Sequence, residues 1–308
     1  MALVKEFADF LVASHRQGTS FGKSITLGRQ SNMLSLDDAL KLSASPVVTD
    51  HFVDTFFHAV LGAHTLDALD YSNYQGANII HDLNTPLPFE LREQYDAVID
   101  GGTLEHVFDF PTALKNLMSL LKPGGSLFLF TPANNLFGHG FYQFSPELFY
   151  SVLAPHNGFR IIKMAIVESY YADVERGMRK RRYAVQNPAN IGGRSIMISC
   201  YPSLLLVHAI KDSQTPDNIT ALQSDYVATW TKTGGGNESS VQKTSMIKRC
   251  GKMLLSLMPS RIEHFARSRY EAIRFYGVKT HPCFSIAPQD YFASDWLDPQ
   301  GGSLAGQP

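Results

Sequence analysis

Short apolar runs alternate with stretches of helical periodicity between residues 24 and 211, and this alternation limits the chain to few folds. The runs are rich in β-branched and aromatic residues, as is typical of strands buried on both faces of a sheet. Such an order predicts an α/β fold, a doubly wound and mostly parallel sheet with helices on both faces. The seven predicted strands span residues 24–28, 64–72, 77–83, 95–102, 126–132, 158–169 and 202–211.

Two helix starts support this division of the chain. Asp109 precedes the Phe-Pro of a run that the turn LKPGG closes at residues 121–125, and Ser145 precedes Pro146. A small polar N-cap followed by proline in the first turn is typical of a helix start. We therefore predict crossover helices after both positions.

The pattern changes after residue 211. Polar residues and three glycines precede a helical periodicity at residues 246–258, and Ser260 with Glu263 fits a capping box for a further helix. We predict a main domain at residues 1–212 and a partly helical C-terminal extension at residues 213–308. Its basic amphipathic helices suit packing on the main domain better than contact with a membrane surface.

The composition excludes some classes of protein. Lys and Arg number 27 against 28 Asp and Glu, so no global field would hold a phosphate backbone, and no nucleic acid partner is expected. The three cysteines are far apart and lack metal-ligand spacing, so we predict no metal site and a reducing, cytoplasmic location. Lys5, Glu6 and Asp9 interrupt any signal-peptide core, and no run reaches membrane-spanning length. Nothing indicates the oligomeric state.

Polar residues and glycines gather where the predicted strands end. Ligands of open parallel sheets bind outside the carboxyl ends of the strands, where the strand order reverses. Asp70 is placed to accept hydrogen bonds from ribose hydroxyls, and Asp82 and Leu83 are placed beside an adenine ring. Gly101 and Gly102 would let the main chain approach such a ligand. Each residue taken alone could equally cap a helix or form a turn.

A family resemblance rests on residues 95–132, YDAVIDGGTLEHVFDFPTALKNLMSLLKPGGSLFLFTP. They resemble the fourth strand, helix and fifth strand of class I methyltransferases, and residues 69–88 and 138–149 resemble a methyltransferase type 11-like bacterial subgroup of these enzymes. The resemblance covers about half the chain and implies a Rossmann-like fold, S-adenosylmethionine as cofactor and methyl transfer as activity. The predicted cofactor-binding residues are Gly28, Arg29, Gln30, Asp70, Tyr71, Asp82, Leu83, Gly101, Gly102 and Thr103.

One segment departs from the family pattern. Typical members follow their first strand with a GxGxG turn, whereas residues 27–33 read LGRQSNM and keep only Gly28. Arg29, Gln30 or Asn32 would then contact the methionine part of the cofactor with their side chains. The interval from Gly28 to His64 is also long, so we predict an extra helix within it.

Candidate catalytic residues follow the fourth and fifth predicted strands. His106 and His139 are the predicted general bases, and Tyr142 and Gln143 are predicted to orient an acceptor. The acceptor is expected to be a small molecule or glycan, with a sugar or metabolite hydroxyl as one option. Glu105 is better explained as a carboxylate at a helix N-terminus. Aromatic residues at 137–144 form either a lid or core under a loop.

Other interpretations stay open. A nicotinamide-dependent oxidoreductase would share the ribose carboxylate but should show GxGxxG after the first strand, which LGRQSNM lacks. The same turn would suit a methyltransferase-like scaffold that has lost catalysis. The basic run at residues 176–182 is expected to be a solvated face, with an anionic acceptor as the alternative.

Overall fold

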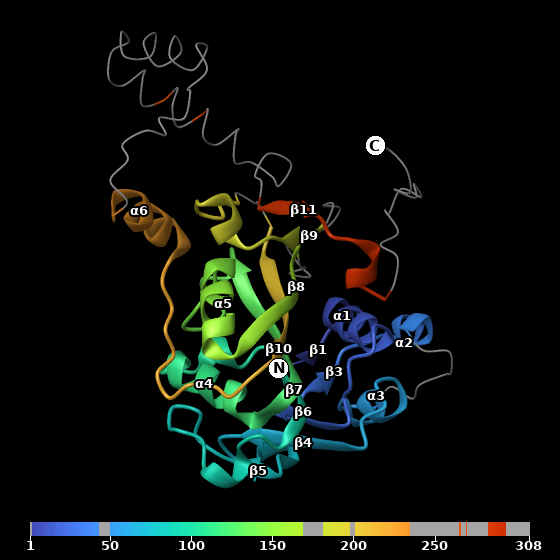
Figure 1. Cartoon of the computed structure of the whole chain (residues 1–308). Coiled ribbons are helices and arrows are strands. Elements are labelled where there is room, and N and C mark those ends of the chain that lie inside the picture. The colour runs from blue at the N-terminus through green and yellow to red at the C-terminus, as the bar shows by residue number, and fades with distance from the viewer. Residues whose placement is uncertain are drawn as a thin grey trace.

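The computed structural model describes residues 2–42, 50–168, 181–197, 201–234, 265, 269 and 283–293. Its main feature is a nine-stranded sheet in the order β11-β9-β8-β10-β7-β6-β2-β4-β5 (Figure 1). These strands are β2 (Lys23–Leu27), β4 (Thr65–Asp70), β5 (Ile79–Ile80), β6 (Tyr95–Asp100), β7 (Leu121–Asn134), β8 (Phe159–Glu168), β9 (Arg182–Val185), β10 (Ser203–Lys211) and β11 (Phe284–Ile286). A separate two-stranded sheet pairs β1 (Ala2–Leu3) with β3 (Ser31–Asn32).

All seven predicted strands are present, as β2, β4, β5, β6, β7, β8 and β10. Two corrections concern the sheet as a whole. It has nine strands rather than seven, since β9 and β11 extend it beyond β8. Parallel pairing joins β5, β4, β2, β6 and β7, whereas every pairing beyond β7 is antiparallel, so the sheet is mixed rather than mostly parallel. Strands as short as β9 and β11 carry too little periodicity to predict.

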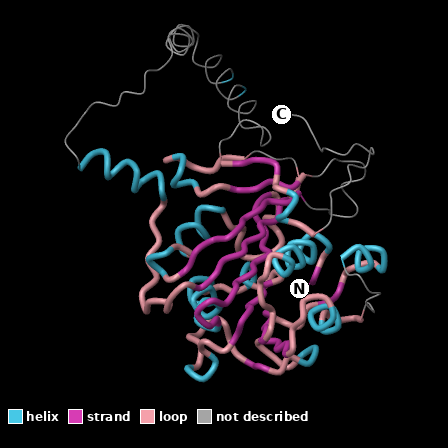
Figure 2. Tube along the Cα trace, turned by 45° about the vertical axis from the view of Figure 1, so that its right-hand side comes forward, coloured by secondary structure: helices cyan, strands magenta, loops and turns pink. Residues whose placement is uncertain are grey.

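Helices cover both faces of the sheet. Figure 1 shows α4 and α5 on one side and α1, α2 and α3 on the other, and Figure 2 shows the strands gathered between them. The helices are α1 (Lys5–Arg16), α2 (Leu36–Leu42), α3 (Asp54–Ala59), α4 (Phe110–Leu120), α5 (Pro146–Val152) and α6 (Ser224–Gly234). Each face buries its own apolar core. No helix within the described ranges is both long and apolar enough to cross a membrane.

The two predicted helix starts are confirmed. The Asp109 carboxylate accepts from the backbone N–H of Thr112 at the start of α4, and the Ser145 hydroxyl accepts from that of Leu148 at the start of α5. The long interval after Gly28 contains α2 and α3, so the extra helix is confirmed as well.

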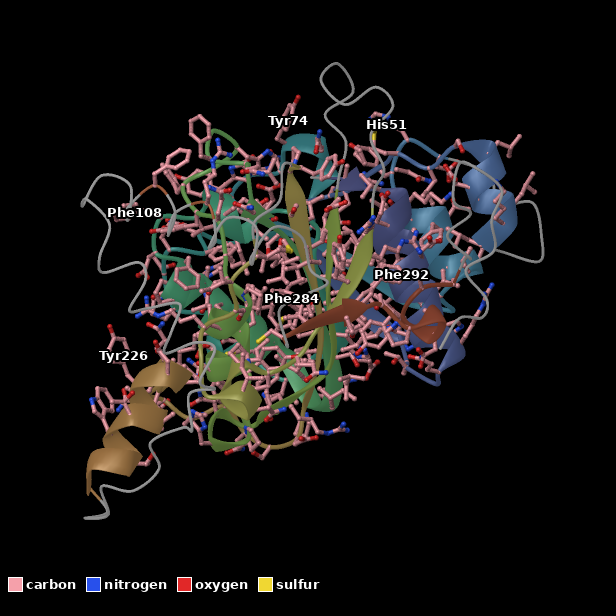
Figure 3. The ribbon with its side chains drawn as sticks, turned by 90° about the horizontal axis from the view of Figure 1, so that it is seen from above. His51, Tyr74, Phe108, Tyr226, Phe284 and Phe292 are labelled. Atoms are coloured by element: carbon pink, nitrogen blue, oxygen red, sulfur yellow. The ribbon has the colours of Figure 1, made fainter. Side chains whose placement is uncertain are left out.

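A C-terminal segment at residues 283–293 packs on the sheet. Its strand β11 pairs with β9, and Phe292 lies 5.8 Å from Phe10 of α1 between ring centroids (Figure 3). The helices predicted after residue 246 lie outside the described residues, and the division at residue 212 stays a prediction. Residues 176–180 of the basic run also lie outside them. Arg182 corrects the expectation of a solvated face, because its side chain is buried 2.8 Å from the Asp9 carboxylate.

His208, at the centre of β10, carries a prediction about stability and pH. Its ring stacks on Phe128 and its Nε2 lies 3.1 Å from the Ser126 hydroxyl, and burial lowers the pKa of His208 to about 3. An unfolded histidine has a pKa of about 6.5, so the unfolded chain binds the extra proton as the pH falls below that value. We expect the free energy of unfolding to fall by up to roughly 1.4 kcal/mol per pH unit for this group.

Urea denaturation at pH 5 and pH 7 checks this expectation. In His208→Gln, which cannot titrate, the difference between the two free energies of unfolding should be smaller than in the parent. Parallel pH dependences in the two proteins would contradict the assignment.

Candidate functional site

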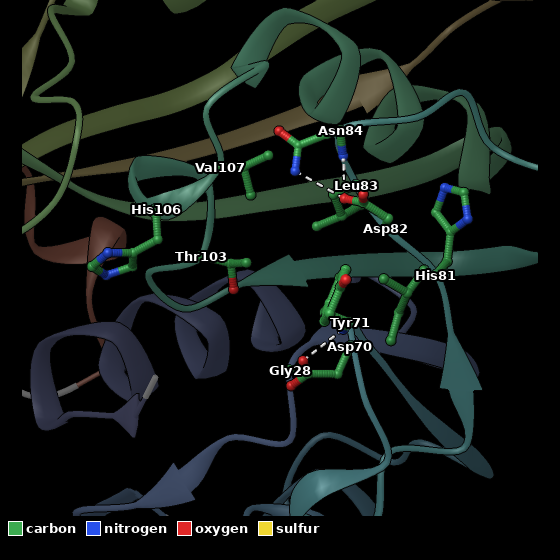
Figure 4. A pocket seen from close by; sticks show the side chains of 11 residues that line it. Gly28, Asp70, Tyr71, His81, Asp82, Leu83, Asn84, Thr103, His106 and Val107 are labelled. Atoms are coloured by element: carbon green, nitrogen blue, oxygen red, sulfur yellow. Dashed lines mark hydrogen bonds between the residues drawn. The ribbon is translucent and has the colours of Figure 1, made fainter.

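A pocket of about 230 Å³ opens at the carboxyl ends of the parallel strands. The strands β2 and β6 are neighbours there, although β4 and β5 come between them in the chain. Such a reversal of strand order is where ligands bind in doubly wound sheets. The pocket is lined by Gly28, Leu69, Asp70, Tyr71, His81, Asp82, Leu83, Asn84, Thr103, His106 and Val107 (Figure 4).

Two carboxylates lie on the walls of this pocket. The Asp70 carboxylate, at the end of β4, accepts from the backbone N–H of Tyr71 over 2.6 Å. Asp82, which follows β5, accepts from both the backbone N–H and the side-chain amide of Asn84, and these hydrogen bonds hold the pKa of Asp82 below its usual value. Both predicted acidic residues are therefore brought together in ionisable, partly exposed positions.

Gly28 and Thr103 also line the pocket. Gly28 has φ +62°, a left-handed conformation that costs a residue with a β-carbon free energy, and its N–H donates to the Leu69 carbonyl oxygen. The Thr103 hydroxyl donates to the Leu27 carbonyl oxygen over 3.2 Å. One glycine is thus enough for this turn, because the chain then enters β3 and pairs with β1 instead of forming a glycine-rich loop.

Arg29, Gln30, Gly101 and Gly102 do not line the pocket. The Arg29 guanidinium lies 3.4 Å from the Asp54 carboxylate and over the Phe52 ring. Gln30 is fully buried, and neither polar atom of its side-chain amide has a hydrogen-bond partner within the part of the chain that the structure describes.

The Gln30 amide lies directly against Gly101. A β-carbon built on Gly101 would come within 2.6 Å of Nε2 and 2.7 Å of Oε1 of Gln30. An unpaired buried donor and acceptor at this point match the carboxylate and ammonium groups at the methionine end of S-adenosylmethionine. The pocket carboxylates match the hydroxyl and amine groups at its adenosine end, so the residues present fit this cofactor.

We expect Gly101→Ala to lower the free energy of unfolding by about 1–3 kcal/mol, the usual cost of overpacking a filled site. Gln30→Ala in the same chain removes the colliding atoms and should recover most of the loss. Urea denaturation of the parent, both single variants and the double variant measures this coupling. Additive effects would show that the two side chains do not share this space.

Asp100 was not among the site residues predicted from the sequence. This residue ends β6 as Asp70 ends β4, so the same signal could have found it. Asp100 is fully buried and accepts from the backbone N–H of Thr103 over 2.7 Å. Burial raises the pKa of Asp100 above its usual value, and burial together with the Asp100 charge raises that of Glu105.

Glu105 differs from its sequence interpretation. It belongs to a three-residue 3₁₀ turn, Leu104–His106, and not to the first turn of α4. Its side chain is 2% exposed, its Oε1 lies 3.5 Å from Nε2 of His139, and its Oε2 has no hydrogen-bond partner among the described residues. Glu105 is thus a buried carboxyl group beside the two predicted bases.

His106 and His139 are brought together, with their ring centroids 5.2 Å apart. Both are exposed, and His106 also lines the pocket. Burial, with the neighbouring His139, lowers the pKa of His106, so its ring is neutral near pH 7. Tyr142 is engaged elsewhere, since its hydroxyl donates to the Phe108 carbonyl oxygen over 2.6 Å.

The aromatic residues near the histidines are split between surface and core. Phe108, Phe137 and Phe141 are exposed, whereas Phe144 is buried. Phe108 and Phe141 meet edge to face at 6.2 Å between centroids, and Figure 3 shows Phe108 at the periphery of the molecule. Exposed aromatic surface therefore lies next to the histidines.

Comparison with known protein families gives a match for part of the chain. Residues 52–129, from α3 through most of β7, match the methyltransferase domain family. No curated protein matches the chain.

Similar solved structures include three bacterial proteins. A Bacillus halodurans protein described as a putative methyltransferase is 13% identical, with a TM-score of 0.37, over 66% of this chain and 99% of its own. The YcgJ protein of Bacillus subtilis is 11% identical, with a TM-score of 0.38, over 66% and 98%. The N-methyltransferase NodS of Bradyrhizobium japonicum, bound to S-adenosylhomocysteine, is 11% identical, with a TM-score of 0.35, over 66% and 84%. Residues 52–129 of the chain thus match a methyltransferase domain, and the strand order around the pocket is that of a doubly wound α/β sheet.

Proposed function

We propose that this methyltransferase acts on a hydroxyl group of a sugar or small metabolite. The observation that supports this most strongly is the pair of exposed histidines at the end of the cofactor pocket. A hydroxyl acceptor needs a group that takes its proton as the new bond forms, and a neutral imidazole is suited to this.

The cofactor roles follow from the pocket. Asp70 would accept from the ribose hydroxyls, and Asp82 with the backbone of Leu83 would meet the adenine ring. Gln30 would supply side-chain contacts at the methionine end, beside Gly101. These assignments are proposals.

The chain's own residues act mainly by positioning. When bound, S-adenosylmethionine supplies an activated sulfonium methyl group. His139 or His106 would accept the proton of the acceptor hydroxyl while the pocket keeps the reacting atoms in line. Phe108 and Phe141 offer an apolar surface beside these polar groups, a combination that suits the apolar face and hydroxyl groups of a sugar ring.

We also propose a cytoplasmic location, because the spacing of the three cysteines shows no disulfide pattern. The domain match favours an enzyme over a scaffold.

Calorimetric titration of the purified chain with S-adenosylmethionine and S-adenosylhomocysteine tests the cofactor part of this proposal, with a nicotinamide dinucleotide as control. Binding of the adenosyl ligands alone supports it and justifies a screen of hydroxyl acceptors. Failure of both to bind would favour the scaffold interpretation.

We expect His139→Ala or His106→Ala to slow methyl transfer by roughly 10²- to 10⁴-fold, the usual contribution of a general base, while affinity for S-adenosylhomocysteine is kept. Single-turnover rates with an acceptor from the screen measure this. His64→Ala is the control, because this exposed histidine precedes β4 at the opposite edge of the sheet. Parent-like rates for both variants would remove proton transfer from the histidines.

A further inference from the structure

A side-chain cluster beside the cofactor pocket combines two imidazoles with a carboxylate. Glu105 and His106 come from the turn after β6, and His139 comes from the loop after β7. One ligand atom from each residue lies within 4.8 Å of the other two. No metal site was expected from the sequence, because the cysteines lack ligand spacing and these three ligands come from segments far apart in the chain.

Glu105 supplies an independent observation. Its side chain is 2% exposed and its Oε2 has no hydrogen-bond partner, yet no Lys or Arg of the described chain forms an ion pair with it. Its neighbours include Asp100, a second buried carboxyl group. Buried carboxylates in proteins are usually paired with a cation or coordinate a metal ion. A bound cation would supply the missing charge.

Backbone hydrogen bonds fix the loop after β7 against the turn after β6. The Glu105 carbonyl oxygen accepts from the N–H groups of Phe141 and Tyr142 over 2.8 and 3.2 Å. Gly140 allows this approach, because a β-carbon there would lie 2.8 Å from the Glu105 carbonyl oxygen and 3.1 Å from Nδ1 of His106. The three candidate ligands are therefore positioned by the fold and not by chance contact of surface side chains.

We propose that Glu105, His106 and His139 bind a divalent first-row transition metal ion of the Zn²⁺ type. Two imidazole nitrogens and one carboxylate oxygen favour such ions over Mg²⁺ or Ca²⁺, which prefer all-oxygen sites. Three protein ligands leave a coordination position open, as in catalytic zinc sites. Since His106 also lines the cofactor pocket, the open position suits an oxygen of the acceptor. A cation there would make the acceptor hydroxyl more acidic, so in the metal-bound protein the two imidazoles act as ligands and not as the general base. The role toward the acceptor rests on the proposed function, whereas metal binding does not.

The test uses the full chain after treatment with a chelator. Calorimetric titration with Zn²⁺ gives affinity and stoichiometry, and titration with Co²⁺ gives a visible absorption band that reports coordination. Each of Glu105→Gln, His106→Ala and His139→Ala should weaken binding by at least about 100-fold, because loss of an outer-shell partner alone costs about 10- to 100-fold. His64→Ala should bind as the parent does, and Mg²⁺ should not displace Co²⁺.

Binding of one equivalent of metal by the parent, together with loss of this binding in the histidine variants, supports the site. No binding by the parent, or parent-like affinity in folded His106→Ala and His139→Ala, overturns it. The two histidines are exposed, so these variants keep the test decisive if Glu105→Gln fails to fold. Titration of the same preparations with S-adenosylmethionine shows separately whether the cofactor pocket works, so failure of the metal site is distinguishable from failure of the proposed function.

Discussion

Asp70→Ala is expected to weaken S-adenosylmethionine binding by about 10- to 150-fold. The carboxylate ends β4 at the pocket wall and is partly exposed, so it can accept from ribose hydroxyls without rearrangement. A hydrogen bond to a charged group contributes about 1.5–3 kcal/mol, which corresponds to this range for the loss of one such bond. Calorimetric titration with S-adenosylmethionine measures the change.

Two further variants sharpen this measurement. Asp70→Asn keeps the shape of the side chain and removes its charge, so it should show an intermediate loss. Asp212→Ala is the matched control, because this exposed carboxylate follows β10 at the other edge of the sheet and pairs with Arg160. An unchanged affinity in a folded Asp70→Ala protein would reject the ribose assignment.

Arg182→Met should lower the free energy of unfolding by about 3–5 kcal/mol, the usual effect of removing one partner from a buried ion pair. The Arg182 and Asp9 side chains are 7% and 0% exposed, and Nη2 lies 2.8 Å from Oδ2. The pair joins β9 to α1, and the guanidinium also lies over the Phe292 ring of the C-terminal segment. Urea denaturation measures the loss.

Arg194→Met is the control for this variant. Its ion pair with Asp225 has the same length, 2.8 Å, but the Arg194 side chain is 58% exposed, so the expected loss is only about 0–1 kcal/mol. The double variant Asp9→Leu with Arg182→Met should be more stable than Arg182→Met alone, because no charge is then left buried. Equal losses of the free energy of unfolding in Arg182→Met and Arg194→Met would show that burial does not set the contribution of these ion pairs to stability.

Local signals in the sequence were sufficient to predict most of the strands and helices of the fold. Each predicted strand carried its own β-branched and aromatic residues, and the N-caps at Asp109 and Ser145 marked helices that the structure confirms. The two carboxylates of the pocket could also be predicted, because Asp70 and Asp82 follow strands whose ends must meet in a parallel sheet.

The burial of Gln30 was harder to predict. Gln30 reads as a polar loop residue, yet in the structure it is fully buried against Gly101. The chain after Gln30 forms β3, which pairs with β1 at the start of the chain, and the Gln30 carbonyl oxygen accepts from the backbone N–H of Val53. No pattern near residue 30 reports a contact with residues so far away in sequence.

The sequence by itself determined the α/β class, the seven central strands and the edge of the sheet at which ligands bind, because periodicity, caps and strand-end residues are local properties. Only the tertiary structure decided what depends on distant contacts. It added β9 and β11, buried Arg182 against Asp9, and placed His139 beside Glu105. Burial and proximity are properties of the packed chain. They decide which polar groups pair with each other and which are available to bind a ligand.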